Sequence, residues 1–432
     1  LKRNLLSDRA FTELRPSIGV VGPLYGGSLP IAQYATDAFL QIGQRTTGID
    51  LSSFHGSFIK VGSFLRNKER RDVVESQYIE MLSQLVIESI SERPIDILVC
   101  LAQAPLSPRA LEEIRSRGII TVMWFVEDCN RFDTWKSMAQ HFDYMFLIQD
   151  GEYIERVQAA GAGRAVYLPV GCDPNVHKPV MVTPEERERF GSPISFVGAG
   201  YNNRRHVFSQ MVRPDFKIWG SEWPACAPFD TLLQEGGRRI DPSEYVKIFN
   251  ASAVNLNLHS SQERDGVDTT GDFVNPRTFE LAASGAFQLI DERKLLPSLF
   301  TPGQEIATFR DERELREKID YYLAHPAERT KMTELARRRA LKEHTYQHRM
   351  KTMLEHIYAD KYEFLRQRIA SSPWSKTLDS AKDVPELHAR LNKAFMRGDP
   401  PELDSLVSDI RTGQGTLNET EQKILFLHHI RS

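Results

Sequence analysis

The sequence has 432 residues, a formal net charge of -3 at pH 7, and 41% hydrophobic and 26% charged residues. This length exceeds one ordinary hydrophobic core and predicts two domains with additional segments. The near-neutral charge excludes the strongly basic surface typical of nucleic-acid binding, so nucleic acid is not an expected partner.

The chain shows no sign of export or membrane insertion. Its first ten residues, L-K-R-N-L-L-S-D-R-A, lack the apolar core of a secretory signal. No apolar run reaches the roughly 18 residues that span a bilayer, so no integral membrane segment is expected. The four cysteines are widely spaced and form no C-x-x-C motif, as is typical of reduced thiols. We therefore expect a cytoplasmic protein without a metal site.

A strand, a glycine turn and a helix open the first α/β unit. S-I-G-V-V-G at 17–22 predicts a buried strand, and residues 31–43 form an amphipathic pattern. Between them, Gly26 and Gly27 either let backbone approach a ligand closely or form only a tight structural turn. Further apolar runs predict strands at 49–54, 95–101, 119–125 and 144–148. Strands that alternate with helical patterns indicate a parallel sheet covered on both faces.

Polar side chains follow several of these strands, at the edge where parallel sheets bind ligands. Glu127 and Asp128 close the segment T-V-M-W-F-V-E-D beside aromatic residues. Burial and mutual repulsion would raise the pKa of one carboxyl, which suits a general base or a group that holds an acceptor hydroxyl. Alternatively, these acids cap the next helix or pair with Arg131. Gln103 and residues 149–150 occupy similar strand ends.

The α/β pattern restarts in a second domain. The first domain ends in the proline-containing segment V-Y-L-P-V-G-C-D-P-N-V-H-K-P at 166–179, and P-I-S-F-V-G-A-G-Y-N-N-R-R-H follows at 193–206. Gly198 leaves room for a diphosphate, and Arg204 and Arg205 can bind phosphate oxygens at a helix start. The alternative is a pair of surface arginines.

The most informative stretch is D-F-V-N-P-R-T-F-E-L-A-A-S-G at 272–285. Asn275 suits a helix N-cap, and the proline after it suits the first helical position. The backbone from Asn275 to Thr278 therefore offers free N–H groups to an anion. Arg277 can reach a phosphate at this helix start, or it can pair with a nearby acid.

Two acids in this stretch, Asp272 and Glu280, lie eight positions apart. Because Asp272 precedes the helix and Glu280 lies on it, both can face one cleft. The spacing resembles the acid-x7-acid signature of retaining GT-B glycosyltransferases, and E-L-A-A-S-G stands where that superfamily commonly has E-A-M-A-x-G. The resemblance implies that Glu280 binds the ribose of a sugar nucleotide. It places Asp272, which is shorter than the usual glutamate, near the transferred sugar.

A narrower resemblance covers residues 193–357. The segments N-P-R-T-F-E-L-A-A-S-G-A-F-Q-L, L-F-T-P-G-Q-E-I and H-T-Y-Q-H-R-M are similar to the bacterial glycosyltransferase-like family named for spore maturation protein B (CgeB). It implies the GT-B fold, in which two Rossmann-like doubly wound α/β domains face a cleft. It also implies that Gly26 and Gly27 face that cleft and that Arg204 or Arg205 binds the diphosphate.

We therefore expect four parts in this chain. They are an N-terminal Rossmann-like domain on the acceptor side, a C-terminal Rossmann-like domain on the donor side, a crossover helix and a helical appendage, at residues 1–179, 180–345, 346–371 and 372–432. The appendage lies outside the resemblance. It is either a docking module for a protein partner or a packing buttress.

The predicted activity is sugar transfer from a nucleotide diphosphate sugar to a hydroxyl of a glycan, a protein or a small molecule. The resemblance favours retention, whereas a true base at Glu127 or Asp128 would favour inversion. No convincing D-x-D motif is present, which agrees with metal-independent catalysis. No cofactor is expected, since the nucleotide sugar is a co-substrate. A non-catalytic nucleotide-sugar-binding scaffold and an epimerase or hydrolase of the same fold are the alternatives.

Overall fold

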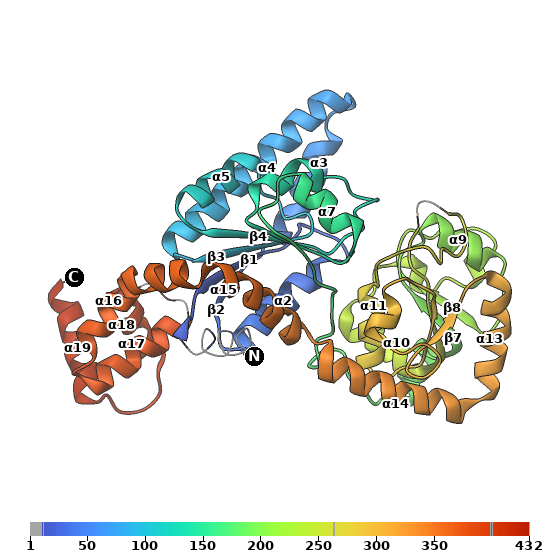
Figure 1. Cartoon of the computed structure of the whole chain (residues 1–432). Helices are drawn as coiled ribbons and strands as arrows, with labels where there is room; N and C mark the ends of the chain where they lie inside the picture. The colour runs from blue at the N-terminus through green and yellow to red at the C-terminus, as the bar shows by residue number, and fades with distance from the viewer. Residues whose placement is uncertain (1–10, 12, 262–263, 398, 400, 432) are drawn as a thin grey trace.

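The computed structural model describes residues 11, 13–261, 264–397, 399 and 401–431. The expected absence of an export signal concerns residues 1–10, which lie outside the described residues, as do residues 12, 262–263, 398, 400 and 432. Two parallel sheets with their covering helices stand next to each other, and a small helical module lies at the far end of the first (Figure 1). None of the helices in the described ranges is long and apolar enough to span a bilayer.

The first sheet has six parallel strands in the order β2-β1-β3-β4-β5-β6. The strands are β1 (Ser17–Val21), β2 (Arg45–Ile49), β3 (Ile97–Leu101), β4 (Ile120–Phe125), β5 (Tyr144–Leu147) and β6 (Ala165–Tyr167). The helices are α2 (Leu29–Gln41), α3 (His55–Ser63), α4 (Lys68–Glu92), α5 (Pro108–Ser116), α6 (Trp135–Met138) and α7 (Glu152–Ala159), with short 3-10 turns η1 (Ser52–Phe54) and η2 (Ala139–His141). Strands β1, β3, β4 and β5 are buried along their whole length, as their apolar runs predict.

The prediction of a strand at residues 49–54 is wrong. The strand in this region, β2, ends at Ile49, and the turn η1 follows it. Because β2 is the edge strand of the sheet, its sequence R-T-T-G-I is only partly buried and contains no apolar run. The apolar pattern of a buried strand therefore fitted residues 49–54 better than it fitted β2 itself.

The second sheet has five parallel strands in the order β11-β10-β9-β7-β8. The strands are β7 (Ser192–Val197), β8 (Phe216–Trp219), β9 (Ser252–Asn257), β10 (Gln288–Asp291) and β11 (Ala307–Phe309). Its helices and 3-10 turns are α8 (Pro184–Phe190), α9 (Asn202–Ser209), η3 (Phe229–Thr231), η4 (Glu235–Gly237), α10 (Pro242–Ala251), α11 (Pro276–Ala283), α12 (Leu296–Leu299), α13 (Glu312–Ala324) and α14 (Pro326–Glu343). The two doubly wound units predicted from the sequence are confirmed.

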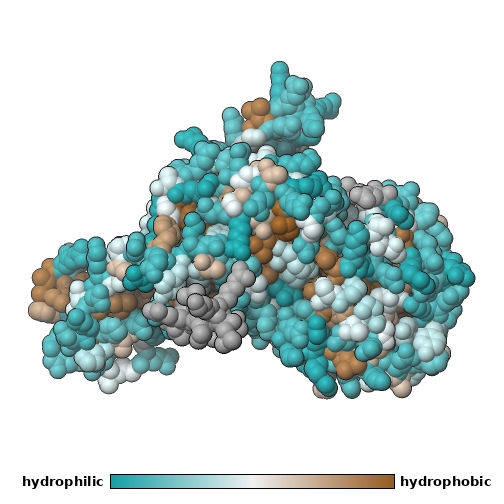
Figure 2. All heavy atoms as spheres, in the orientation of Figure 1, coloured by the Kyte–Doolittle hydropathy of each residue, from teal (hydrophilic) through white to brown (hydrophobic). Residues whose placement is uncertain are grey.

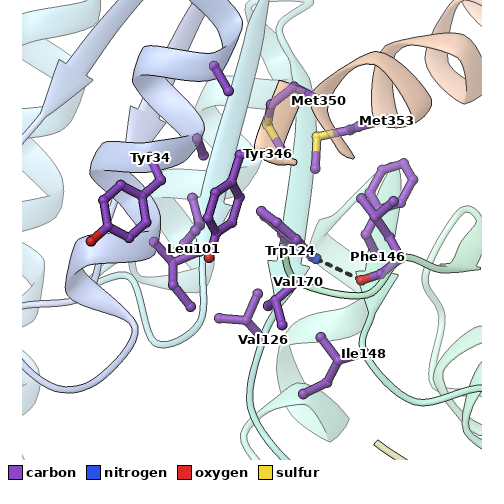
Figure 3. Close-up of a cluster of buried hydrophobic side chains, with 14 of the residues drawn as sticks. Tyr34, Leu101, Trp124, Val126, Phe146, Ile148, Val170, Tyr346, Met350 and Met353 are labelled. Atoms are coloured by element: carbon purple, nitrogen blue, oxygen red, sulfur yellow. Dashed lines mark hydrogen bonds between the residues drawn. The ribbon is translucent and has the colours of Figure 1, made fainter. Parts of the chain in front are cut away.

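A long helix, α15 (Tyr346–Ser371), returns from the second domain and packs on the first. Its first residue, Tyr346, lies in the buried cluster of Figure 3, with its ring centre 5.3 Å from that of Tyr34 and 6.1 Å from that of Trp124. Trp124 also donates a hydrogen bond from Nε1 to the carbonyl of Leu168, at 3.1 Å. The start of α15 is therefore fixed in the core of the first domain.

The chain crosses between the domains at two segments that lie side by side. The Cys172 N–H donates to the carbonyl of His344 at 2.9 Å, and the Tyr346 N–H donates to the carbonyl of Cys172 at 2.9 Å. Gly171 lies within this contact, where an added Cβ would be 2.6 Å from the carbonyl oxygen of His344. The chain therefore passes between the domains twice, at two segments that are hydrogen-bonded to each other.

Four helices form the appendage around a core of their own: α16 (Pro373–Ala381), α17 (Pro385–Arg397), α18 (Leu403–Thr412) and α19 (Glu419–Arg431). Helix α17 lies beside β2, and the guanidinium of Arg45 is 3.7 Å from the ring centre of Phe395. The appendage therefore covers the open edge of the first sheet, which agrees with a packing buttress. Figure 2 shows apolar side chains at its outer end, over α19, where Phe426, Leu427 and Ile430 are exposed.

Candidate functional site

A cavity of about 510 Å³, here called the central cavity, lies between the two domains. One wall is the loop between β1 and α2, which contains Gly26 and Gly27. The opposite wall is built from strand ends and helix starts of the second domain. Of the residues predicted from the sequence, the structure brings together in this cavity Gly26, Gly27, Gly198, Arg204, Arg277 and Glu280.

Arg204 presents a cation to the central cavity from the first turn of α9. Its Nε donates to the carbonyl of Leu258 at 2.8 Å, and Nη1 donates to the carbonyl of Ala199 at 3.0 Å. Burial lowers the pKa of Arg204 to about 10, so it stays charged at neutral pH. Among the described residues no carboxylate lies within 4.0 Å of its guanidinium. A cation fixed by carbonyls but without a carboxylate partner suits an anionic ligand.

Arg277 and Glu280 lie one turn apart on α11 and form an ion pair, with Nη1 2.7 Å from Oε2. The guanidinium of Arg277 also lies 4.3 Å from the ring centre of Tyr245. Glu280 is only 7% exposed, and its Oε1 lies 3.9 Å from Nε2 of His177. Of the two alternatives for Arg277, the ion pair with a nearby acid is therefore present, and the acid is Glu280. Both residues line the central cavity.

Asn275 and Thr278 do not line this cavity. Asn275 accepts a hydrogen bond from the Thr278 N–H at 3.1 Å, and its amide donates to Asn257 Oδ1 at 2.8 Å. The Asn275 N–H donates to Nε2 of His259, whose Nδ1 lies 2.7 Å from Asp291 Oδ1. Burial lowers the pKa of His259 to about 4, so this histidine is neutral. These residues hold the start of α11 in place, and the Thr278 N–H is not free for an anion.

Asp272 lies in a second, smaller cavity between the domains, of about 210 Å³. The amide of Gln149 donates to Asp272 at 2.9 Å and to Asp128 at 3.3 Å, so it joins carboxylates from both domains. Asp128 lines the same small cavity. Asp272 and Glu280 therefore both lie between the domains, but only Glu280 lines the central cavity. Gln149 lies two residues after the end of β5, and this strand-end position was the sequence signal for its role.

Glu127 contacts the loop between β1 and α2, here called the glycine loop. Its carboxylate accepts a hydrogen bond from the Ser28 hydroxyl, and Glu127 lines neither cavity. Burial raises the pKa of Glu127, and the Asp128 carboxylate adds to this, while Ser28 and Arg131 oppose it. Glu127 therefore positions the glycine loop in this structure.

Asp128 has a pKa raised mainly by burial and then by the Asp272 carboxylate. Because the pKa is raised in the folded state, the ionised carboxyl lowers the free energy of unfolding. This destabilisation is absent below the ordinary carboxyl pKa of about 3.9, where the group is protonated in both states. Asp128→Asn should therefore raise the melting temperature at pH 8. The gain should shrink as the pH falls and disappear near pH 4. Scanning fluorimetry of both proteins from about pH 4 to 8 measures this difference.

The exposed residue Asp150, which lies three residues after β5, provides the control. Asp150→Asn should leave the melting temperature unchanged across the same range. A pH-independent effect of Asp128→Asn would contradict the assignment.

Two arginines that were not predicted as site residues, Arg239 and Arg131, contact the other domain. Arg239 donates from Nη2 to the carbonyl of Gly26 at 2.5 Å, and its guanidinium lies 5.1 Å from the ring centre of Tyr25. The guanidinium of Arg131 lies 4.0 Å from the ring centre of Tyr201. Each pair joins segments far apart in the chain, so no local pattern could reveal it.

The comparisons with known proteins fit this geometry. A family model described as "Glycosyl transferase-like" matches residues 203–355, which contain Arg204, Arg277 and Glu280. The structure of sucrose-phosphate synthase from Thermosynechococcus elongatus aligns with a TM-score of 0.52 at 13% identity, over 83% of this chain and 100% of that one. The chain carries a glycosyltransferase domain and has the GT-B fold. The resemblance stated from the sequence is thereby confirmed.

Two further known proteins are similar to this chain. The spore protein CgeB of Bacillus subtilis (strain 168) is 23% identical over 228 residues, which cover 50% of this chain and 69% of that protein. Anabaena HepE, solved in complex with UDP and glucose, aligns with a TM-score of 0.54 at 10% identity, over 80% of this chain and 100% of that one.

Proposed function

We propose that this glycosyltransferase binds a nucleoside diphosphate sugar in the central cavity and transfers its sugar to an acceptor hydroxyl brought by the first domain. The observation that carries the proposal is the meeting of Arg204, Arg277 and Glu280 in one interdomain cavity. The structure of HepE with UDP and glucose supports a donor of this class.

Each charged group has a distinct role in the proposal. Glu280 accepts hydrogen bonds from the ribose hydroxyls, and Arg204 and Arg277 bind the diphosphate. Gly198 keeps the backbone clear beside them, since an added Cβ would lie 3.0 Å from the ring of Phe196 and 3.3 Å from the guanidinium of Arg204. Two guanidinium groups can offset the charge that grows on the leaving diphosphate, as a divalent metal does in other transferases. This supports metal-independent transfer.

We further propose transfer with retention. The acceptor oxygen bonds to the anomeric carbon, the bond from that carbon to the diphosphate oxygen breaks, and its electron pair leaves with the nucleoside diphosphate. The acceptor proton passes to the departing diphosphate. A trehalose-6-phosphate synthase described as acting "with retention" has a similar fold, with a TM-score of 0.52. NMR of the product anomer tests this choice, and an inverted anomer would instead make Asp128 or Glu127 the base.

The donor assignment is tested by thermal shift with UDP, GDP, dTDP, CDP and ADP and their common sugars. A ligand at a hundred times its Kd should stabilise the native protein by about 2.7 kcal/mol. One nucleotide family should stabilise the wild type, and Glu280→Ala should reduce the shift to near zero. The shift of each variant is measured against the same variant without ligand, so that a change in basal stability cancels.

A suitable control is Glu314, an ion-paired glutamate on α13 that does not line the central cavity. Glu314→Ala should retain the full ligand-induced shift. The proposal fails if no nucleotide at millimolar concentration stabilises the wild type.

A further inference from the structure

A third cavity, here called the apolar pocket, opens in the first domain and has a volume of about 460 Å³. Its floor includes Met123 and Phe125 at the end of β4 and Met145 of β5, all at most 5% exposed. Phe58 and Ile59 of α3 line its outer side. Ligands of parallel sheets bind at such strand ends.

The chemistry of this pocket differs from that of the central cavity. Among the described residues that line it, none is Asp, Glu, Lys or Arg. The hydroxyls of a sugar acceptor, or the phosphate of a phosphorylated one, would lose hydration here without charged partners. Aromatic side chains instead line much of the pocket, including Phe58, Phe125 and Trp135, and Met123 and Met145 add polarizable sulfur.

The apolar pocket adjoins the central cavity. Tyr25 lines both cavities and lies in the loop between β1 and α2, directly before Gly26. Its ring stacks on His55, with ring centres 4.5 Å apart and planes inclined by 10°. Tyr25 and Ile59 are each 54% exposed, so an occupant of the pocket would cover apolar surface that now faces solvent. A group projecting past Tyr25 would reach the proposed donor.

We propose that the acceptor is an aromatic hydroxyl compound whose ring system fills the apolar pocket and whose hydroxyl extends past Tyr25 into the central cavity. The inference rests on the proposed function, since the same hydroxyl oxygen forms the new bond to the anomeric carbon. The few polar lining groups, including Gln103 and Thr134, can bind ring substituents.

Calorimetric titration with 2-naphthol, 1-decanol and glucose 6-phosphate, each in the absence of nucleotide, tests the pocket. The wild type should bind 2-naphthol with a sub-millimolar Kd and the other two at least about tenfold more weakly. Glucose 6-phosphate would bring a charge and several hydroxyls to an apolar site, which costs more than about 1.4 kcal/mol. The chain of 1-decanol would lose conformational freedom on binding and has no ring to pack on the aromatic side chains. Tighter binding of 1-decanol would replace the aromatic class and overturn the proposal. Competition by glucose 6-phosphate would overturn it as well.

Ile59→Asp places a carboxylate at the pocket wall and should weaken 2-naphthol binding at least tenfold. The matched control is Phe64→Asp, because Phe64 follows the same helix, is 89% exposed and does not line the pocket. The control should bind 2-naphthol like the wild type. Equal effects of the two substitutions, or none from Ile59→Asp, would overturn the proposal.

The nucleotide thermal shift separates this inference from the proposed function. If a nucleotide stabilises both variants but 2-naphthol does not bind the wild type, the acceptor inference alone fails. If 2-naphthol binds as expected but no nucleotide does, the donor assignment fails and the pocket stands as an aromatic-binding site. With both bound, mass spectrometry should detect glycosylated 2-naphthol, and a product from 1-decanol alone would overturn the inference.

Discussion

Replacing Arg204 with methionine should lower kcat by about 10²- to 10³-fold, the loss typical of removing one preorganised donor from a developing negative charge. Methionine keeps much of the side-chain volume against Phe196 and Tyr201, whose ring centres lie 5.2 and 5.0 Å from the guanidinium. The loss should appear mainly in kcat, since the charge on the leaving group is greatest in the transition state. Steady-state kinetics with the stabilising nucleotide sugar measures it.

The adjacent arginine, Arg205, is the control for this loss in kcat. Arg205 donates to the carbonyl of Glu222 and does not line the central cavity. Arg205→Met should therefore cost less than about fivefold in kcat, because it removes no contact with the transition state. Equal losses in the two variants would show that charge near α9, rather than contact with the diphosphate, explains the effect.

Gly171→Ala should destabilise the protein by about 1–3 kcal/mol, as overpacking does in a filled interior. The added Cβ would lie 2.6 Å from the carbonyl oxygen of His344 and 3.2 Å from the carbonyl carbon of Thr345. Both are backbone atoms, so neither can move aside alone, and the two domain crossings must separate. If these crossings act as a hinge for closure on the proposed donor, turnover should also fall.

Thermal unfolding and kinetics of the same samples measure both effects. The control is Gly56→Ala in α3, where an added Cβ meets no atom within 4 Å and the backbone has no positive φ. This substitution should be neutral or stabilise by up to about 1 kcal/mol, since alanine favours helix. A Gly171→Ala protein with wild-type stability and turnover would contradict the role of the crossing as a hinge.

Local sequence signals predicted the central strands of the first sheet and the start of α11 correctly. The four central strands of the first sheet are continuous apolar runs, because a parallel sheet covered on both faces buries every side chain. The N-cap at Asn275 and the helix after it were readable, because capping depends on neighbours within one turn. The same turn places Arg277 and Glu280 on one face of α11.

Only the tertiary structure decided which residue of each predicted pair lines the central cavity. Arg204 and Arg205 are adjacent in sequence, but successive helical residues point about 100° apart, and only packing decides which direction meets the cavity. Likewise, Asp272 and Glu280 have the spacing of the superfamily, yet only Glu280 lines the central cavity, and Asp272 accepts a hydrogen bond from Gln149 of the other domain.

The sequence by itself determined the two α/β domains, the charged residues of α11 and the resemblance to glycosyltransferases, because each is carried by contiguous residues. Only the tertiary structure brought Arg239 to the carbonyl of Gly26 and joined the apolar pocket to the central cavity through Tyr25. These features join segments far apart in the chain, from β1 to the loop before α10. Their proximity depends on how the two domains pack, which no local periodicity or spacing encodes.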